Sequence, residues 1–211
     1  MVNPIIQKYE PLVDLLADLF GSDCEVVLHD IKNPEHSIIK IRNGHITSRT
    51  RGGPITDLGL KMIKDNKPET ILYTEKTKEG RTLRCAGLVI RDESKKIAGY
   101  LCINLDISSL NIWDSQNREI HSDSDRKISF NHLEHFEMNI KSLIRVNTDE
   151  IMNNIYSNKR FEELTKAEKL EVLKRLNSKG IFLVKGAVKE IAEILSVSSV
   201  SIYKYLEEIR Q

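Results

Sequence analysis

Hydrogen-bonding side chains gather near the C-terminus of this chain, within a stretch whose apolar pattern is that of a helix-turn-helix. The stretch runs from Gly186 to Arg210, and Ala192 stands where two helices cross so closely that only a small side chain fits. The positions where such a unit needs apolar contacts are Ile191, Leu195, Val197, Ile202 and Tyr205. Ser196 breaks the first helix, and Ser198 is placed to cap the second by accepting a backbone N–H. We expect this second helix, Ser198 to Glu207, to enter the major groove of DNA.

The outward positions of the second helix carry groups that suit phosphates and base edges. The residues that we expect to contact DNA are Ser198, Ser199, Ser201, Tyr203, Lys204 and the preceding Lys185. The predicted helix lacks arginine, the side chain that most often reads guanine, and Ser196 occupies a turn position that glycine would adopt more easily. The same pattern also fits an ordinary helical hairpin in an all-α subdomain, so both interpretations stay open at this point.

A second set of polar residues lies inside otherwise apolar blocks of the N-terminal half. The candidates for contact with a small molecule are His29, Asp30, Asn43, His45, Arg49 and Asn104. An arginine near an aspartate is able to hold the carboxylate and amine of an amino-acid-like ligand through charge-assisted hydrogen bonds. Structural interpretations stand beside this one. Asn43 begins a turn signal, His29 with Asp30 ends a predicted strand, and a buried asparagine at 104 can satisfy backbone groups.

The sequence shows no catalytic or metal-binding constellation. Cys24, Cys85 and Cys102 are far apart and lack metal-ligand spacing. His132 and His135 have no further ligand at a suitable distance along the chain. There is no nucleophile beside a base and no phosphate-binding glycine loop. We therefore expect no enzymatic activity, no cofactor and no metal ion.

The composition is that of an ordinary globular protein without a strong electrostatic field. The chain has 211 residues, of which 40% are hydrophobic and 30% charged, and its net charge is +1. From residue 161 onward, nine basic residues stand against eight acidic ones. One copy is expected to bind DNA weakly, since counterion release scales with the phosphates neutralised. A homodimer or higher oligomer would double the contacts.

Neither a signal peptide nor a membrane-spanning apolar run is present in the sequence. The N-terminal stretch lacks a basic segment followed by an apolar core, and no apolar run reaches the length that a bilayer requires. We therefore expect a cytoplasmic protein that makes no contact with a membrane.

The pattern along the first half predicts an α+β domain. Apolar residues at helical spacing follow Asn3 and Pro4 up to Gly21. A weak helical pattern at Pro54–Lys64 separates the second and third of five β-like runs. These runs are Cys24–Asp30, Ser37–Arg42, Ile71–Lys76, Leu83–Asp92 and Ile97–Leu105. The order predicts a PAS-like antiparallel five-stranded sheet with helices, and a GAF domain is the alternative.

A polar linker and a further helix are expected between this domain and the C-terminal one. Residues 111–127 are polar and charged, and apolar residues from Phe130 to Ile155 then recur at helical spacing. We expect this helix to bury its stripe against a partner subunit, with the sheet of the first domain as the alternative. Thr165 and Glu168 form a capping box that opens the next helix at Lys166. The predicted domains are a sensor at 1–110, a linker with a dimerisation helix at 111–160, and an all-α helix-turn-helix domain at 161–211.

Longer blocks of the sequence resemble one family. Residues 24–30 (CEVVLHD), 43–49 (NGHITSR), 54–60 (PITDLGL) and 99–108 (GYLCINLDIS) are similar to the sensor domain of YheO-like transcriptional regulators. Residues 168–206 resemble the DauR-type helix-turn-helix that follows the sensor in that family. Thr47-Ser48 and Ser196 depart from the family's usual Ser-Gly and Gly. The resemblance implies a PAS-like sensor, a DNA-binding output and no catalysis.

These observations predict a DNA-binding transcriptional regulator whose PAS-like domain senses a small molecule or mediates dimerisation. The alternative is a sensor and scaffold protein whose C-terminal helices bind another protein, and the near-neutral charge of those helices keeps it open. An enzyme that uses the cavity of the sheet is a third hypothesis, which the lack of catalytic residues disfavours.

Overall fold

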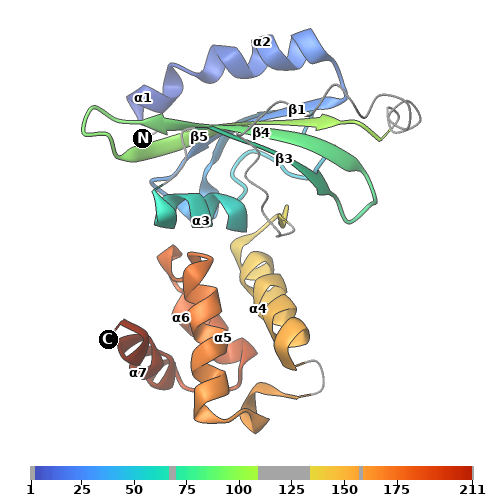
Figure 1. Cartoon of the computed structure of the whole chain (residues 1–211). Coiled ribbons are helices and arrows are strands. Elements are labelled where there is room, and N and C mark those ends of the chain that lie inside the picture. Colours follow the sequence, from blue (N-terminus) through green and yellow to red (C-terminus); the bar gives the residue numbers. More distant parts are fainter. Residues whose placement is uncertain (1–2, 67–69, 109–133, 157–158, 211) are drawn as a thin grey trace. The chain divides into compact units, whose positions relative to one another are not determined.

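The computed structural model describes residues 3–66, 70–108, 134–156 and 159–210 of the chain (Figure 1). They form two compact units. The N-terminal unit comprises Met1–Ile55 and Lys67–Met138, and the C-terminal unit comprises Thr56–Asn66 and Asn139–Gln211. No helix within the described residues is long and apolar enough to span a membrane.

Two helices stand where the sequence predicts one. α1 (Pro4–Gln7) is capped by Asn3, whose Oδ1 accepts the Ile5 N–H at 3.0 Å, and α2 (Glu10–Phe20) follows a break at Lys8 and Tyr9. Pro11 lies in the first turn of α2, where its missing N–H is tolerated. In the interior of a continuous helix the same proline would remove a hydrogen bond and clash with the preceding turn. The chain therefore starts a new helix there.

Five antiparallel strands form one sheet in the order β2–β1–β5–β4–β3. Each strand begins and ends within one residue of a predicted run. The strands are β1 (Cys24–Asp30), β2 (Ile38–Arg42), β3 (Thr70–Lys76), β4 (Thr82–Arg91) and β5 (Ile97–Asp106). A 3-10 turn, η1 (Pro34–His36), connects β1 to β2. The predicted PAS-like five-stranded sheet is confirmed.

The two faces of the sheet differ because successive side chains of a strand point to opposite sides. One face carries Val26 and Leu28 of β1 and Leu101 of β5, which are buried with Val13 and Ala17 of α2. Figure 1 shows α2 lying along this face of the sheet. The larger apolar cluster of the N-terminal unit is thus on the α2 side, while the other face carries polar residues beside a smaller cluster of Ile46, Leu83 and Cys85.

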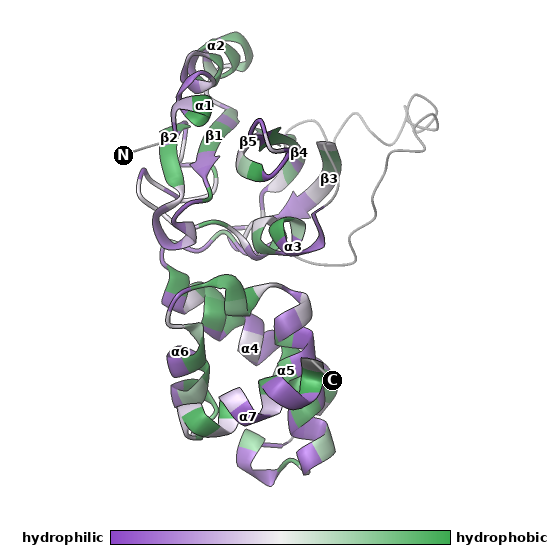
Figure 2. Ribbon diagram, turned by 90° about the vertical axis from the view of Figure 1, so that its left-hand side faces the viewer, coloured by the Kyte–Doolittle hydropathy of each residue, from purple (hydrophilic) through white to green (hydrophobic). Residues whose placement is uncertain are grey.

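The C-terminal unit is all helical. Its helices are α3 (Asp57–Asp65), α4 (Ile140–Tyr156), α5 (Lys166–Ser178), α6 (Ala187–Ile194) and α7 (Ser199–Arg210), with 3-10 turns η3 (Phe161–Glu163) and η4 (Ile181–Leu183). Figure 2 shows hydrophobic and hydrophilic stretches on the ribbons of α5, α6 and α7. Leu173, Leu176, Ile181, Ile191 and Ile202 are fully buried in this unit. Gly180 adopts a left-handed backbone after α5, where a Cβ would lie 2.7 Å from the Leu60 carbonyl oxygen.

α4 differs from the prediction in the residue at which it begins and in the elements that bury its apolar side chains. Phe130 and His132 lie outside the described residues, and residues 134–139, which include His135, are not helical. The buried side chains of α4, among them Leu143 and Ile144, pack within the C-terminal unit against α5 and α6. A continuous helix from Phe130 to Ile155 is therefore wrong at residues 134–139. Leu143 and Ile144 are covered by α5 and α6 rather than by a partner subunit, whereas Phe136 packs against the sheet, as the alternative predicted. Dimerisation and the domain limits at 110 and 160 stay predictions.

The capping box at the start of α5 is confirmed. Thr165 Oγ1 accepts the Glu168 N–H at 3.3 Å, and Glu168 Oε2 accepts the Thr165 N–H at 2.7 Å. Hydrogen bonds from Lys159 and from the Thr165 backbone lower the pKa of Glu168 to about 2. Because this folded-state pKa lies below the ordinary value of 4.5, the stabilisation is complete above pH 4.5 and is lost as the pH falls towards 2.

Replacing Thr165 by alanine should destabilise the C-terminal unit by about 1 kcal/mol, the usual cost of a lost N-cap. Urea denaturation followed by circular dichroism at pH 7 measures this change. Thr165→Ser keeps the accepting hydroxyl and should unfold close to the wild type. Equal midpoints for Thr165→Ala and the wild type would show that the box contributes nothing to stability.

Candidate DNA interface and sensor core

The turn between α6 and α7 has the geometry that a helix-turn-helix needs. Ser196 has a left-handed backbone with a φ of 54°, and the Val197 N–H donates to the Ala192 carbonyl at 2.9 Å. Ser198 Oγ accepts the Ser201 N–H at 3.1 Å and so caps α7. The predicted break at Ser196 and the predicted cap at Ser198 are both confirmed.

Small and apolar residues hold α6 and α7 together as predicted. Ile191, Leu195 and Ile202 are buried, and the small Ala192 is 4% exposed. Tyr205 is only half-buried, although the sequence places it among the apolar contacts. These contacts set the direction in which α7 presents its outer face.

The outer face of α7 differs in part from the predicted set of donors. The Ser198 and Ser201 hydroxyls lie 2.9 Å apart and bond to each other, so both serve the cap. Tyr203 is 58% exposed and Lys204 is exposed, as the sequence predicts. Val200 was missed, yet it is 76% exposed and lies one helical turn before Tyr203 and Lys204. An exposed apolar side chain at that spacing is suited to contact a thymine methyl group.

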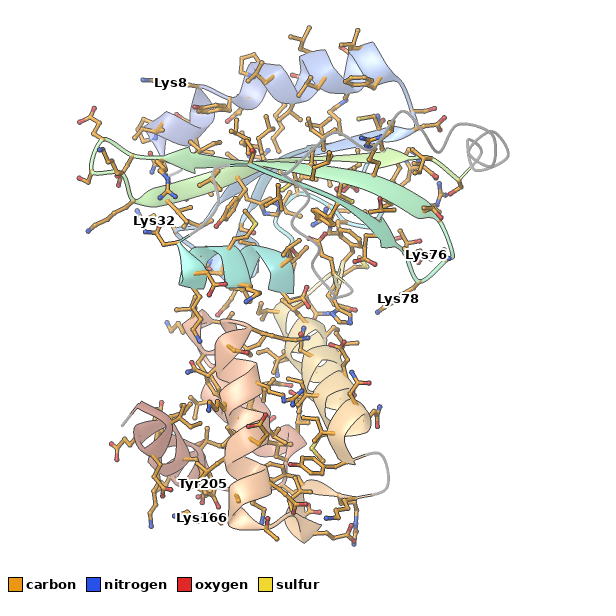
Figure 3. All side chains as sticks on the ribbon, viewed as in Figure 1. Lys8, Lys32, Lys76, Lys78, Lys166 and Tyr205 are labelled. Carbon is orange, nitrogen blue, oxygen red and sulfur yellow. The ribbon has the colours of Figure 1, made fainter. Side chains whose placement is uncertain are left out.

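The surroundings of α7 carry two lysines that are free of acidic partners. Lys185 and Lys204 are exposed and form no ion pair with any residue that the structure describes. By contrast, Lys166 of α5 (Figure 3) pairs with Glu208 of α7 at 2.9 Å. Ser199 and Tyr203 also line a cavity of about 380 Å³, with Lys189 on its α6 side. Donor groups from α6 and α7 thus converge on one recess.

In the N-terminal unit, a row of side chains with polar groups crosses four strands. Glu25 of β1 lies opposite Asn104 of β5, which lies opposite Cys85 of β4 and, beyond it, Tyr73 of β3. We call these four residues the polar row. By alternation they share the face of the sheet that α2 does not cover.

The predicted ligand residues Arg49 and Asn104 meet at Glu25, a carboxylate that the sequence analysis missed. Glu25 Oε1 accepts from Arg49 Nη2 and from Asn104 Nδ2, both at 2.8 Å. Thr47 Oγ1 donates to Glu25 Oε2 at 2.6 Å and accepts from Arg49 Nε at 2.9 Å. Arg49 therefore forms its ion pair with Glu25 inside the unit. A charged residue inside the apolar run CEVVLHD was the signal, because a buried carboxylate needs a partner.

The Glu25–Arg49 pair is fully buried. Glu25 is 0% exposed and Arg49 is 3% exposed. Burial disfavours the guanidinium charge, but the attraction of Glu25 and Glu134 outweighs it and raises the pKa of Arg49. The arginine therefore stays protonated inside the unit.

The other predicted ligand residues lie apart from this pair. Asp30 accepts the Asn3 and Lys32 N–H groups at 2.9 and 3.0 Å, so it joins the N-terminus to the end of β1. Asn43 Nδ2 donates to the Gly21 and Cys24 carbonyls at 2.9 and 2.8 Å. His45 is exposed. A ligand role for these residues stays a prediction.

His29 and Tyr100 lie opposite each other on β1 and β5, on the same face as the polar row. His29 Nδ1 and Ser37 Oγ form a hydrogen bond of 2.9 Å. Burial, with a smaller effect of Arg49, lowers the pKa of His29 to about 3, so the ring is neutral near pH 7. The Tyr100 hydroxyl is buried and has no hydrogen-bond partner among the described residues. A buried group of this kind costs roughly 1–3 kcal/mol unless water or a ligand satisfies it.

The cysteines and carboxylates do not assemble a metal site in the described part of the chain. No group of three or more histidine, cysteine, aspartate or glutamate side chains there is arranged to hold a metal ion. Cys24, Cys85 and Cys102 are free thiols, and burial raises the pKa of Cys102 to about 12. This thiol is therefore protonated at neutral pH.

Replacing His29 by glutamine should flatten part of the pH dependence of stability. In the unfolded chain His29 takes up a proton near pH 6.5, whereas in the folded chain it stays neutral down to about pH 3. Its contribution therefore lowers the free energy of unfolding as the pH falls below 6.5, by up to about 1.4 kcal/mol per pH unit. Urea titrations of both proteins between pH 7 and pH 4 measure the difference, and parallel curves would contradict it.

Two family models match the chain in the order in which the units occur. A YheO-like PAS domain matches residues 1–121, and a helix-turn-helix domain matches residues 147–207. The second match begins within α4 and extends through α5 and α6 into α7.

Three curated relatives are similar to the chain over almost its whole length. An uncharacterized protein of Haemophilus influenzae is 30% identical over 98% of this chain and 92% of its own length. The uncharacterized protein YheO of Escherichia coli K12 is 28% identical over 98% and 85%. The transcriptional regulator DauR of Pseudomonas aeruginosa is 25% identical over 99% and 96%. The chain therefore belongs to the YheO-like family of transcriptional regulators, in which a PAS domain precedes a helix-turn-helix domain.

Proposed function

We propose that this protein binds double-stranded DNA through α7 and that its N-terminal unit controls this binding. The observation that carries the proposal is the α6–α7 geometry, in which the Ser196 turn and the Ser198 cap present an outer face with Val200, Tyr203 and Lys204. Helices held in this way enter the major groove with their N-terminal residues towards the bases.

Each predicted contact has a distinct role in this proposal. Lys185 and Lys204 neutralise phosphates, because neither is engaged by an acid among the described residues. Tyr203 reaches base edges, together with Val200. Ser198, Ser199 and Ser201 lie at the N-terminus of α7, where backbone N–H groups and the helix dipole favour a phosphate.

The form of the protein that binds DNA is a homodimer or higher oligomer in this proposal. The segment from residue 161 carries nine basic and eight acidic residues, so a single copy offers few uncompensated cations. Two copies place two recognition helices on one duplex, with half-sites one helical turn, about 34 Å, or a multiple of it apart.

The N-terminal unit binds a small effector in this proposal, and we expect an amino-acid-like molecule. The other role proposed for this unit is dimerisation. The unpartnered hydroxyl of Tyr100 supports this, because it lies buried beside His29 on the face of the polar row. Among the predicted ligand residues, Arg49 and Asn104 are on this face, but Glu25 already engages both.

Tyr203→Ala and Lys204→Ala should each weaken binding to specific DNA while leaving the fold intact. Gel-shift or anisotropy titrations with fragments recovered by genomic mapping of the intact protein measure the affinity. Lys204→Ala should also lower the slope of log affinity against log salt by about one per bound copy, since one phosphate contact is lost.

Lys8→Ala is the matched control for this experiment. Lys8 is an exposed lysine of the N-terminal unit (Figure 3), so its loss changes the net charge equally but removes no contact of α7. Unchanged DNA affinity in both α7 variants would exclude α7 as the reader. Salt-insensitive binding would favour the alternative function, in which the exposed Val200 and Tyr203 contact another protein.

Two copies of the chain are expected on each DNA site. Analytical ultracentrifugation of the intact protein with a fragment that carries one site measures the stoichiometry, and the protein alone serves as reference. A single copy bound at full affinity would contradict the dimer, because its few free cations could not account for tight binding.

A further inference from the structure

Residues Glu134–Glu137, which we call the strap, form the last part of the N-terminal unit and lie next to the polar row. The Glu134 N–H donates to Glu75 Oε2 at 2.7 Å, and the Tyr73 hydroxyl donates to the Glu134 carboxylate. The Phe136 ring faces Arg49, whose guanidinium carbon lies 4.9 Å from the ring centroid.

Polar and ionic contacts dominate this docking. The strap forms neither helix nor strand, so side chains of the sheet and of Arg49 hold it. Glu134 is 9% exposed, and Phe136 packs beside the buried Ile46, Leu83 and Cys85. Hydrogen bonds to charged groups and a desolvated cation–π contact are among the stronger interactions of their size.

The outer end of the strap is also held by an ion pair. Lys78, which follows β3 (Figure 3), pairs with Glu137. The Lys78 side chain is 64% exposed, so this pair contributes little by itself. The buried contacts of Glu134 and Phe136 therefore determine whether the strap is docked.

The strap leads directly into α4. Only Met138 separates it from Asn139, whose Oδ1 accepts the Ser142 N–H at 2.9 Å in the first turn of that helix. A link of two peptide units spans little more than 7 Å even when extended. The chain therefore has little slack between the last docked residue and the start of the helix.

α4 is in turn joined to the helix-turn-helix. Lys141 pairs with Glu190 of α6 at 3.2 Å. Lys179, which follows α5, donates to Asn147 and to Glu150 of α4 at 2.8 and 2.6 Å. A change at the start of α4 therefore reaches α6 through contacts within the C-terminal unit.

We propose that the strap occupies the polar-row face of the sheet in place of an effector, and that its docking anchors the first turn of α4. A molecule that stacks on the Arg49 guanidinium or bonds to the Tyr73 hydroxyl must displace Phe136 or Glu134, because these side chains already hold those contacts. Release of the strap then frees the start of α4 and changes DNA affinity. This last step rests on the proposed DNA-binding function, whereas the docking and the anchoring do not.

Hydrogen–deuterium exchange of the intact protein tests the docking and the anchoring without DNA. Phe136→Ala removes the ring from Arg49, and Tyr73→Phe removes the hydroxyl that Glu134 accepts. Both should raise the exchange rate of residues 134–144 by about tenfold. Tyr73→Phe loses one hydrogen bond to a charged group, and Phe136→Ala loses a desolvated cation–π contact of similar strength. Amides of β1 and α2 should keep their protection, which shows that the fold persists.

Two further variants make the result specific. Phe136→Leu keeps apolar volume but loses the π face, so its increase in exchange should be smaller than that of Phe136→Ala. Leu15→Ala removes an exposed side chain of α2 (61% exposed) and should leave residues 134–144 unchanged. Unchanged exchange in Phe136→Ala and Tyr73→Phe overturns the docking. Faster exchange at 134–139 without a change at 140–144 overturns the anchoring.

DNA titrations of the same variants test the last step. Phe136→Ala and Tyr73→Phe should shift DNA affinity by about fivefold or more, a typical allosteric coupling. Unchanged affinity together with faster exchange overturns the coupling to DNA. If the wild type itself binds no DNA, the proposed function fails, and the exchange result still decides the docking and the anchoring.

Discussion

A buried ion pair between Glu25 and Arg49 joins β1, β5, the segment after β2 and the strap in the N-terminal unit. Glu25 lies on β1, next to the central strand β5, and Arg49 comes from the segment after β2. Because the interior excludes water, each charge depends on the other, and removing one would leave the second uncompensated. Thr47, Asn104 and the Phe136 ring complete the surroundings of the pair. One interaction thus fixes the loop after β2, the middle of the sheet and the strap.

The same pair explains why the polar face differs from the α2 face. The α2 side is a conventional apolar core, in which close packing tolerates many substitutions of similar volume. On the other face, the stability of the buried polar groups depends on each donor having an acceptor. Only the Tyr100 hydroxyl stands out as unsatisfied among the buried side-chain atoms that the structure describes.

In the C-terminal unit, local hydrogen bonds determine where the helices begin and end. Thr165 and Glu168 start α5, and Ser198 starts α7. α4 adds two buried polar residues, Asn147 and Thr148, whose side chains bond back to carbonyls of their own helix. These groups are satisfied within α4, so the helix can be buried by α5 and α6 without leaving polar atoms unpaired.

The sequence alone determined the strands, the caps and the helix-turn-helix. Strand alternation, the Thr165 capping box and the Ser196–Ser198 turn are local patterns that act over a few residues, and family blocks supported the order of the domains. The sequence also placed Arg49 and Asn104 among the functional candidates, but not Glu25, which joins them. That grouping depends on strand register, which brings together residues up to 79 positions apart.

Only the tertiary structure decided what covers α4 and where Phe136 lies. Helical spacing from Phe130 onward suggested one continuous amphipathic helix, yet Phe136 leaves that pattern and packs beside Arg49. Periodicity records which side chains are apolar but not which surface buries them. The sequence therefore revealed an apolar stripe, and long-range contacts divided it between the polar-row face of the sheet and the helical unit.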